Sequence, residues 1–126
     1  MSGRPIVHIE IPAQSPAKLS AFYKELFGWE LQSVPGMPYV TFKTSPMQFG
    51  DPGLGGGFQP IDGQLYKPGD VTVYIGSGDI KADLKQIERL GGKTVLPKTE
   101  IPSTGWYALF TDPDGNRLAL FTPSQM

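Results

Sequence analysis

The chain has no cysteine among its 126 residues, and this absence excludes several kinds of chemistry. Disulfide bonds, thiolate catalysis and zinc sites built on sulfur all need cysteine, although a cysteine-free chain fits either redox compartment. Histidine is almost as scarce, because His8 is the only one. Any imidazole chemistry in this protein must therefore involve His8.

The chain also lacks an excess of charge of either sign and any long hydrophobic run. Eleven Lys and Arg residues stand against 12 Asp and Glu residues, which argues against nucleic acid and anionic membranes as partners. No apolar stretch approaches the roughly 20 residues that span a bilayer, and residues 1–5 lack the apolar region of a signal peptide. We therefore expect a cytoplasmic protein with no membrane partner.

What the sequence does contain is a duplication. Residues 7–31 align with residues 71–95 without a gap at a constant offset of 64, as His8 and Thr72 illustrate. The residues that recur are apolar strand and helix positions, helix caps and glycine stops, namely Val7 and Val71, Ile11 and Ile75, Ser15 and Asp79, Leu26 and Leu90, Gly28 and Gly92. Two small modules that cannot each bury a core tend to pair, often around a shared cleft.

Hydrophobic periodicity predicts the same order of elements, βαβββ, in both halves. The abundance of Gly (16) and Pro (13) indicates short elements that are separated by tight turns. We expect one α+β domain with module one at about residues 5–59, a linker at 60–70 and module two at about 71–123. The expected strands are 7–11, 29–34, 39–44, 54–59, 71–75, 93–97, 106–111 and 117–122, with helices 16–27 and 80–90 and a loop from Ser45 to Gly53.

Several segments carry a resemblance to a known superfamily. The most specific are FYKELFGW at residues 22–29, IERLGGK at 87–93 and DPDGN at 112–116, supported by VHIEIP and LGGGF. They resemble the vicinal oxygen chelate (VOC) superfamily, which includes glyoxalase I, bleomycin-resistance proteins and extradiol dioxygenases. The resemblance covers nearly the whole chain. It implies two tandem βαβββ modules that form an incomplete barrel around a cavity, commonly in a homodimer.

The resemblance also implies where a divalent metal would bind. In metal-dependent members such as glyoxalase I, the first and last strands of each module supply one ligand each. By comparison with these members, His8 lies at the first ligand position, but the other positions fall on Thr72, on Ala119 and within residues 55–58. A catalytic zinc or iron site needs about three protein ligands. We therefore expect no metal and no cofactor.

Alternation along the strands predicts which side chains line the cavity. Val7, Ile9 and Ile11 would face the helix, so His8 and Glu10 would lie on the other face, about 7 Å apart by strand rise. We consider this pair as catalytic candidates, with His8 as donor or acceptor and Glu10 as its orienting group or as a base. The expected ligand-binding residues are His8, Glu10, Thr72, Tyr74, Trp106, Arg117 and Phe121. Trp106, Tyr107, Tyr39 and Phe42 come from neighbouring strands, and alternation alone does not say which of them face the cavity.

Two other segments are less informative than they look. The run from Gly53 to Gly57 lacks the Lys-Ser/Thr and the helix of a phosphate-binding loop. The segment from Asp112 to Asn116 lacks the remaining ligands of a calcium loop and predicts a hairpin turn.

Three functions remain open. The first is a bleomycin-resistance-like protein that binds an aromatic or peptide-like small molecule in an aromatic-lined cavity without the usual metal. The second is an enzyme, namely a lyase, isomerase or dioxygenase, that uses His8 and Glu10 with an atypical metal site or as acid and base. Such an enzyme would be lactoylglutathione lyase-like or dioxygenase-like. The third is a regulatory or partner-binding module whose cavity is vestigial. In each case the other expected partner is a second copy of the chain.

Overall fold

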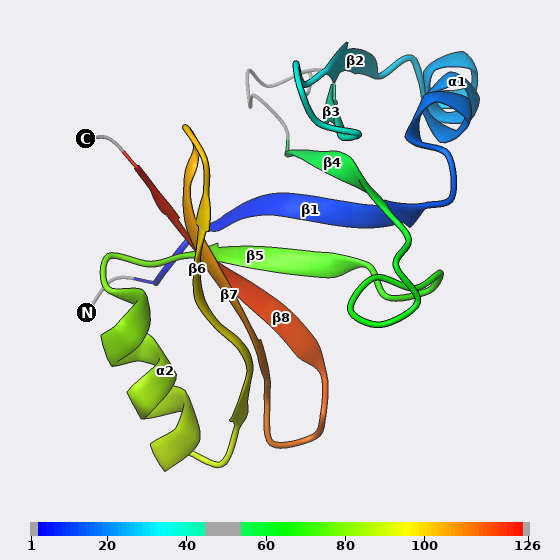
Figure 1. Cartoon of the computed structure of the whole chain (residues 1–126). Coiled ribbons are helices and arrows are strands. Elements are labelled where there is room, and N and C mark those ends of the chain that lie inside the picture. The colour runs from blue at the N-terminus through cyan, green and yellow to red at the C-terminus, as the bar shows by residue number, and fades with distance from the viewer. Residues whose placement is uncertain (1–2, 45–53, 125–126) are drawn as a thin grey trace. The chain divides into compact units, whose positions relative to one another are not determined.

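The computed structural model describes residues 3–44 and 54–124, which contain eight strands and two helices in two compact units. One unit comprises residues 8–71, and the other joins the residues up to Val7 with those from Thr72 onward. Each unit has one helix and four strands, so the expected pair of βαβββ modules in an α+β fold is confirmed (Figure 1). No helix of the described part is long and apolar enough to cross a membrane.

Module one begins with β1 (Ile6–Ala13), which continues through Pro12 rather than ending there as the sequence suggested. Helix α1 (Pro16–Phe27) follows, and then come β2 (Glu30–Ser33), β3 (Val40–Lys43) and β4 (Gly55–Pro60). The strand order is β2-β3-β4-β1, with β1 parallel to β4 and the other pairs antiparallel. The loop expected from Ser45 to Gly53 lies outside the described residues.

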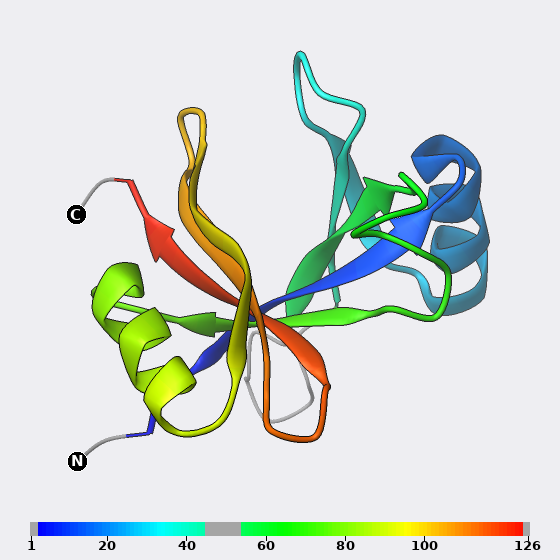
Figure 2. The same ribbon diagram turned by 60° about the horizontal axis from the view of Figure 1, so that its bottom comes forward.

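Module two has the same topology. It consists of β5 (Thr72–Gly76), α2 (Ile80–Arg89), β6 (Lys93–Ile101), β7 (Gly105–Thr111) and β8 (Arg117–Pro123), in the order β5-β8-β7-β6. Strand β5 runs parallel to β8, as β1 does to β4. Figure 2 shows β6, β7 and β8 of this module from a second direction. The duplication seen in the sequence is therefore a duplication of strand pairing as well.

The helix ends follow from local chemistry. The Ser15 side chain accepts a hydrogen bond from the backbone N–H of Lys18, Pro16 occupies the first turn, and Gly28 ends α1 with a φ of 72°. Asp79 caps α2 in the same way through the backbone N–H of Ala82. Ser15 and Asp79 therefore mark where the two helices begin, and Gly28 marks where α1 ends.

Each helix packs on one face of its own sheet and leaves the opposite face uncovered by helix. We call that second surface the helix-free face of the module. In module one, α1 residues pack with Ala13, Phe42 and Phe58, and in module two α2 packs on Ala108, Phe110 and Leu120. Directly paired residues on neighbouring strands point to the same side of a sheet, so a regular register assigns the paired residues to one face or the other.

The N-terminal segment is fastened to module two. The Gly76 N–H donates a hydrogen bond to the Pro5 carbonyl at 3.0 Å, and the Arg4 guanidinium makes two hydrogen bonds to the Asp83 carboxylate at 2.6 and 2.9 Å. The Ser77 hydroxyl donates to the same carboxylate. The Arg4 guanidinium beside Asp83 holds the pKa of that carboxyl below its usual value. This ion pair ties the start of the chain to the first turn of α2.

Candidate functional site

The helix-free face of module one carries a hydrogen-bonded group of three side chains. Glu10 pairs with Gly57 across β1 and β4, and Gly57 pairs with Thr41 across β4 and β3. Because Ile11 packs in the α1 core, its neighbour Glu10 points the other way, as does His8 two residues earlier. The face that alternation assigned to His8 and Glu10 is therefore the face they occupy.

Tyr39 joins these two residues. Its hydroxyl donates a hydrogen bond to Glu10 Oε2 at 2.9 Å and lies 2.8 Å from His8 Nε2. The His8 and Tyr39 rings are nearly parallel, at 17° with 6.5 Å between their centroids. We call this group the His8–Tyr39–Glu10 network.

Gly57 provides the space for the Tyr39 ring. A Cβ atom added at Gly57 would overlap the Tyr39 hydroxyl and the ring carbons beside it. Gly57 has no positive φ, so its backbone does not itself require glycine. The missing side chain instead lets the phenol of Tyr39 lie against the sheet between His8 and Glu10.

The network is largely removed from solvent. Glu10 is only 6% exposed, and burial lowers the pKa of the His8 imidazole. Burial, the Glu10 carboxylate and the nearby Tyr66 phenol together raise the pKa of the Tyr39 hydroxyl. His8 is therefore neutral and Tyr39 protonated near neutral pH.

Tyr66 belongs to the segment that follows β4 within the unit of residues 8–71, a segment that the sequence suggested only as a linker. Its backbone N–H donates a hydrogen bond to the Asp62 carboxylate at 2.9 Å, and its carbonyl accepts one from the Asp62 N–H at 3.1 Å. Tyr66 is buried. This tight turn carries an aromatic side chain to the surroundings of Tyr39.

The helix-free face of module two has a different chemistry. Arg117 donates a hydrogen bond to the hydroxyl of the buried Thr72 at 3.0 Å. The Tyr74 and Tyr107 rings lie 6.4 Å apart on the same face, and Tyr107 pairs directly with Phe121. The structure thus brings Thr72, Tyr74, Arg117 and Phe121 to one surface.

Trp106 is the expected site residue that lies elsewhere. It packs against the core beneath α2, on the opposite face from Tyr107, and the Lys98 ammonium lies 4.8 Å from the centroid of its ring. Alternation along β7 allows only one of these two adjacent residues to share a face with Tyr74. The structure gives that place to Tyr107.

The internal register relates the two faces residue by residue. Glu10, which pairs with Gly57, corresponds to Tyr74, which pairs with Ala119. Thr41 pairs with Gly57, and Leu109 pairs with Ala119. Tyr39 and Tyr107 lie two residues before Thr41 and Leu109, so these two tyrosines also correspond to each other. Each module therefore places a tyrosine near a small residue on its fourth strand, but only module one adds a histidine and a carboxylate.

The described residues do not fit a divalent metal of the kind that the VOC resemblance implies. The Tyr39 phenol fills the space that a ligand side chain at Gly57 would need, and its hydroxyl already bonds both His8 Nε2 and Glu10 Oε2. Within residues 3–44 and 54–124, no three His, Asp or Glu side chains are grouped to hold a metal ion. We therefore assign no chemistry here to a metal.

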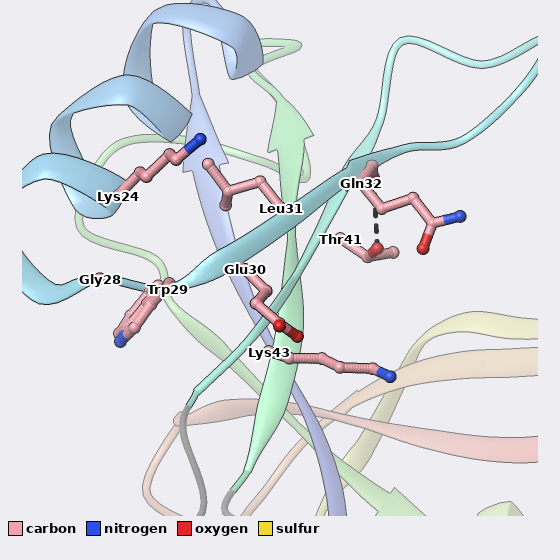
Figure 3. Close-up of a pocket in the computed structure, with 8 residues that line it drawn as sticks. All are labelled: Lys24, Gly28, Trp29, Glu30, Leu31, Gln32, Thr41 and Lys43. Atoms are coloured by element: carbon pink, nitrogen blue, oxygen red, sulfur yellow. Dashed lines mark hydrogen bonds between the residues drawn. The ribbon is translucent and has the colours of Figure 1, made fainter.

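A separate pocket of about 550 Å³ lies along the edge strand β2 (Figure 3). Its lining includes Lys24 and Trp29, and on the paired strands Glu30 and Lys43 lie opposite each other. Figure 3 shows Lys24 beside Leu31 and away from Glu30. The three charged residues that line the pocket, Lys24, Glu30 and Lys43, are exposed. The lining of the pocket does not include the His8–Tyr39–Glu10 network.

Comparisons with known proteins agree with this fold. Residues 8–121 match the family model described as a glyoxalase-like domain. A superfamily member from Vibrio splendidus 12B01, described as glyoxalase/bleomycin resistance protein/dioxygenase, superposes with a TM-score of 0.64 at 14% identity, over 95% of this chain and 99% of that one. Methylmalonyl-CoA epimerase from Streptomyces coelicolor gives a TM-score of 0.70 at 18% identity, over 98% and 100%.

One curated relative is similar in sequence. The anthracycline biosynthesis protein DauV of Streptomyces sp. (strain C5) is 29% identical in an alignment of 115 positions that covers 83% of this chain and 42% of the relative. The chain thus spans less than half the length of that protein. Because the family model covers residues 8–121, the chain belongs to the glyoxalase-like domain family of the VOC superfamily.

Proposed function

We propose that this protein binds a flat, aromatic small molecule at the helix-free face of module one and does so without the usual divalent metal of the superfamily. The observation that carries the proposal is the Tyr39 phenol, which lies over Gly57 and bonds His8 and Glu10. A hydrogen-bonded phenol, imidazole and carboxylate offer polar groups that orient a ligand, next to ring surfaces that favour stacking.

The relatives support an aromatic ligand. DauV is named for anthracycline biosynthesis, and members of the superfamily include bleomycin-resistance proteins. On module two, the ring pair of Tyr74 and Tyr107 with Phe121 offers a further aromatic surface, and the Arg117 guanidinium offers hydrogen-bond donors. We propose Thr72, Tyr74, Arg117 and Phe121 as contacts for an aromatic ligand on the helix-free face of module two.

Elemental analysis tests the metal-independent part of this proposal. Protein purified without a metal-affinity tag is expected to contain well under 0.1 equivalent of zinc, manganese, iron, nickel or cobalt. The proposal would be contradicted if the protein contained stoichiometric metal and if removal of that metal by chelation also abolished ligand binding. A thermal-shift screen with hydroxylated naphthalenes, hydroxyanthraquinones and peptide antibiotics tests ligand binding, because a ligand that binds only the folded state raises its melting temperature.

A second candidate function is metal-free proton transfer. Glu10 is a buried carboxylate within a hydrogen-bonded network, an arrangement that can accept a proton from a bound carbon acid. The similarity to methylmalonyl-CoA epimerase suggests a first substrate to test. Exchange of the substrate's α-hydrogen in D2O, followed by NMR, would support this function if Glu10→Gln abolished the exchange.

The two candidates give different results in these assays. Binding of aromatics without hydrogen exchange supports the binding protein, whereas exchange that depends on Glu10 supports the enzyme. A chain that neither binds any of these compounds nor catalyses exchange would match a regulatory module with a vestigial site. Sedimentation of the same sample tests whether the protein also forms the expected homodimer.

A further inference from the structure

Helix α1 carries two large apolar side chains that lie outside the core of module one. Phe22 is 55% exposed and Leu26 is 59% exposed, and the two residues lie on successive turns of the helix. The residues of α1 that pack in the core are instead Leu19 and Tyr23. A contiguous apolar patch, unlike a single exposed side chain, is typical of a surface that binds a partner.

The internal duplication shows that the fold does not require this apolar pair. The offset of 64 places Gln86 of α2 at the position of Phe22, and the exposed Gln86 accepts a hydrogen bond from Arg89. Leu90, the counterpart of Leu26, is also exposed. Helix α2 thus packs on its sheet with a polar residue where α1 has an aromatic ring. The role of that ring therefore lies outside the packing of helix on sheet.

Charged residues of opposite sign flank Phe22 along the helix. Lys18 precedes it by four residues and Glu25 follows it by three, and all three side chains are exposed. Lys18 and Glu25 are seven residues apart, so they share one side of the helix, about 10 Å apart along its axis. The exposed Ala21 beside Phe22 leaves room for another helix to approach. Lys24, the remaining charged residue of α1, lines the pocket along β2 instead.

We propose that a second copy of the chain binds this surface, through antiparallel pairing of the two α1 helices about a twofold axis. Both copies then use the same surface. The two Phe22 rings meet near the axis, and Lys18 of each copy lies opposite Glu25 of the other. Parallel pairing would instead bring like charges together. The inference does not depend on ligand binding, and it assigns a contact surface to the homodimer that the sequence led us to expect.

Sedimentation velocity of the full chain from about 1 to 300 µM measures this association. We expect Leu26→Gln and Phe22→Gln each to weaken dimerisation at least about tenfold, because a symmetric interface loses the side chain twice. Leu90→Gln is the matched control, since it makes the same change at the equivalent, equally exposed position of α2. It should change the dissociation constant less than about twofold. Circular dichroism shows whether each variant is folded.

A charge exchange tests the antiparallel orientation. Lys18→Glu should weaken dimerisation roughly three- to tenfold at low salt, because Glu25 of the other copy then faces a like charge. Adding Glu25→Lys to this variant restores opposite charges across the axis, and dimerisation should recover to within about twofold of the unmodified protein. Both changes also suit the helix dipole, which favours acidic residues near the start of a helix and basic residues near its end.

Three results would overturn the inference. The first is an unmodified protein that remains monomeric at the highest concentration. The second is a dimer that Phe22→Gln leaves intact, or that Leu26→Gln and Leu90→Gln weaken equally. The third is a double charge variant that associates as weakly as Lys18→Glu alone. Each result concerns association only, so the proposed ligand binding is tested separately by the thermal-shift screen.

Discussion

The Tyr39 ring lies against the sheet at the position where Gly57 has no side chain, and its hydroxyl connects His8 to Glu10. Gly57 adopts an ordinary extended conformation, so the reason for glycine is the ring above it rather than the backbone. This dependence of one residue on the size of another can be measured as a coupling free energy.

The first prediction is a double-mutant cycle between these two residues. Gly57→Ala should lower the free energy of unfolding by about 1–3 kcal/mol, because the new methyl group forces Tyr39 out of its position. In the Tyr39→Ala background the same change should be neutral, or stabilising by up to about 1 kcal/mol, since the clash is gone and the unfolded chain loses entropy. Urea unfolding of the four proteins provides the numbers.

Gly78→Ala is the control for this cycle. Gly78 has no atom within 4 Å of an added Cβ and no positive φ, so its substitution should change stability by less than about 0.5 kcal/mol. If Gly57→Ala proved equally destabilising with and without the Tyr39 ring, the seating of that ring on Gly57 would be refuted.

The second prediction concerns pH and His8. Burial lowers the pKa of His8 in the folded state below the 6.5 of an exposed imidazole. The unfolded chain therefore binds a proton that the folded chain does not, so this residue destabilises the fold as the pH decreases from about 6.5 toward the folded pKa. The free energy of unfolding should rise with pH across that window and level off above it.

His8→Gln removes the titrating group and keeps a hydrogen-bond donor. Denaturant unfolding between pH 5 and 8 should show a flatter pH dependence for this variant than for the unmodified protein. Identical slopes for the two proteins would show that His8 is not buried as a neutral imidazole.

The third prediction concerns Arg4 and Asp83. The pKa of Asp83 is lowered in the folded state, so its contribution to stability is present above about pH 4 and is lost as the pH falls through the lowered folded value. Arg4→Gln should reduce stability at neutral pH and weaken the acid dependence. Arg89→Gln is the control, since the Arg89 side chain donates its hydrogen bond to the neutral side chain of Gln86. An effect of Arg4→Gln no larger than that of Arg89→Gln would argue against the ion pair.

The fourth prediction separates Trp106 from the ligand-binding face. Because Trp106 packs under α2, Trp106→Ala should lower the melting temperature but change the affinity for 1-naphthol less than twofold. Phe121→Ala, on the helix-free face of module two with Tyr107, should instead weaken the binding of an aromatic ligand to that face. A large loss of affinity in a folded Trp106→Ala protein, measured by calorimetry, would place the ligand on the other face.

The duplicated pattern predicted the fold well because it rests on local rules. Alternation along β1, the cap at Ser15 and the glycine stop at Gly28 each depend on neighbours in sequence, and the structure confirms all three. Strand lengths were less predictable, since β1 runs through Pro12 and β6 extends to Ile101. The ends of a strand are set by its pairing with neighbouring strands, and the sequence of the strand alone does not reveal that pairing.

Only part of the candidate site could be predicted from the sequence. Alternation placed His8 and Glu10 on one face, but the position of Tyr39 depends on the empty space at Gly57, 18 residues further along the chain. The adjacent Trp106 and Tyr107 could not be assigned to faces without the register to β8. The glycine run in β4 was a usable signal, because glycine within a strand often marks the close approach of another group.

The most direct test of the account is a calorimetric titration of 1-naphthol into untagged protein that has been dialysed against EDTA. It is repeated after one equivalent of Zn²⁺ or Mn²⁺ is added. We predict saturable binding with the same affinity in all three samples, lost together with the His8–Tyr39–Glu10 network in the Tyr39→Ala variant. Binding that appears only after metal is added would contradict the central claim that Tyr39, rather than a metal, organises this site.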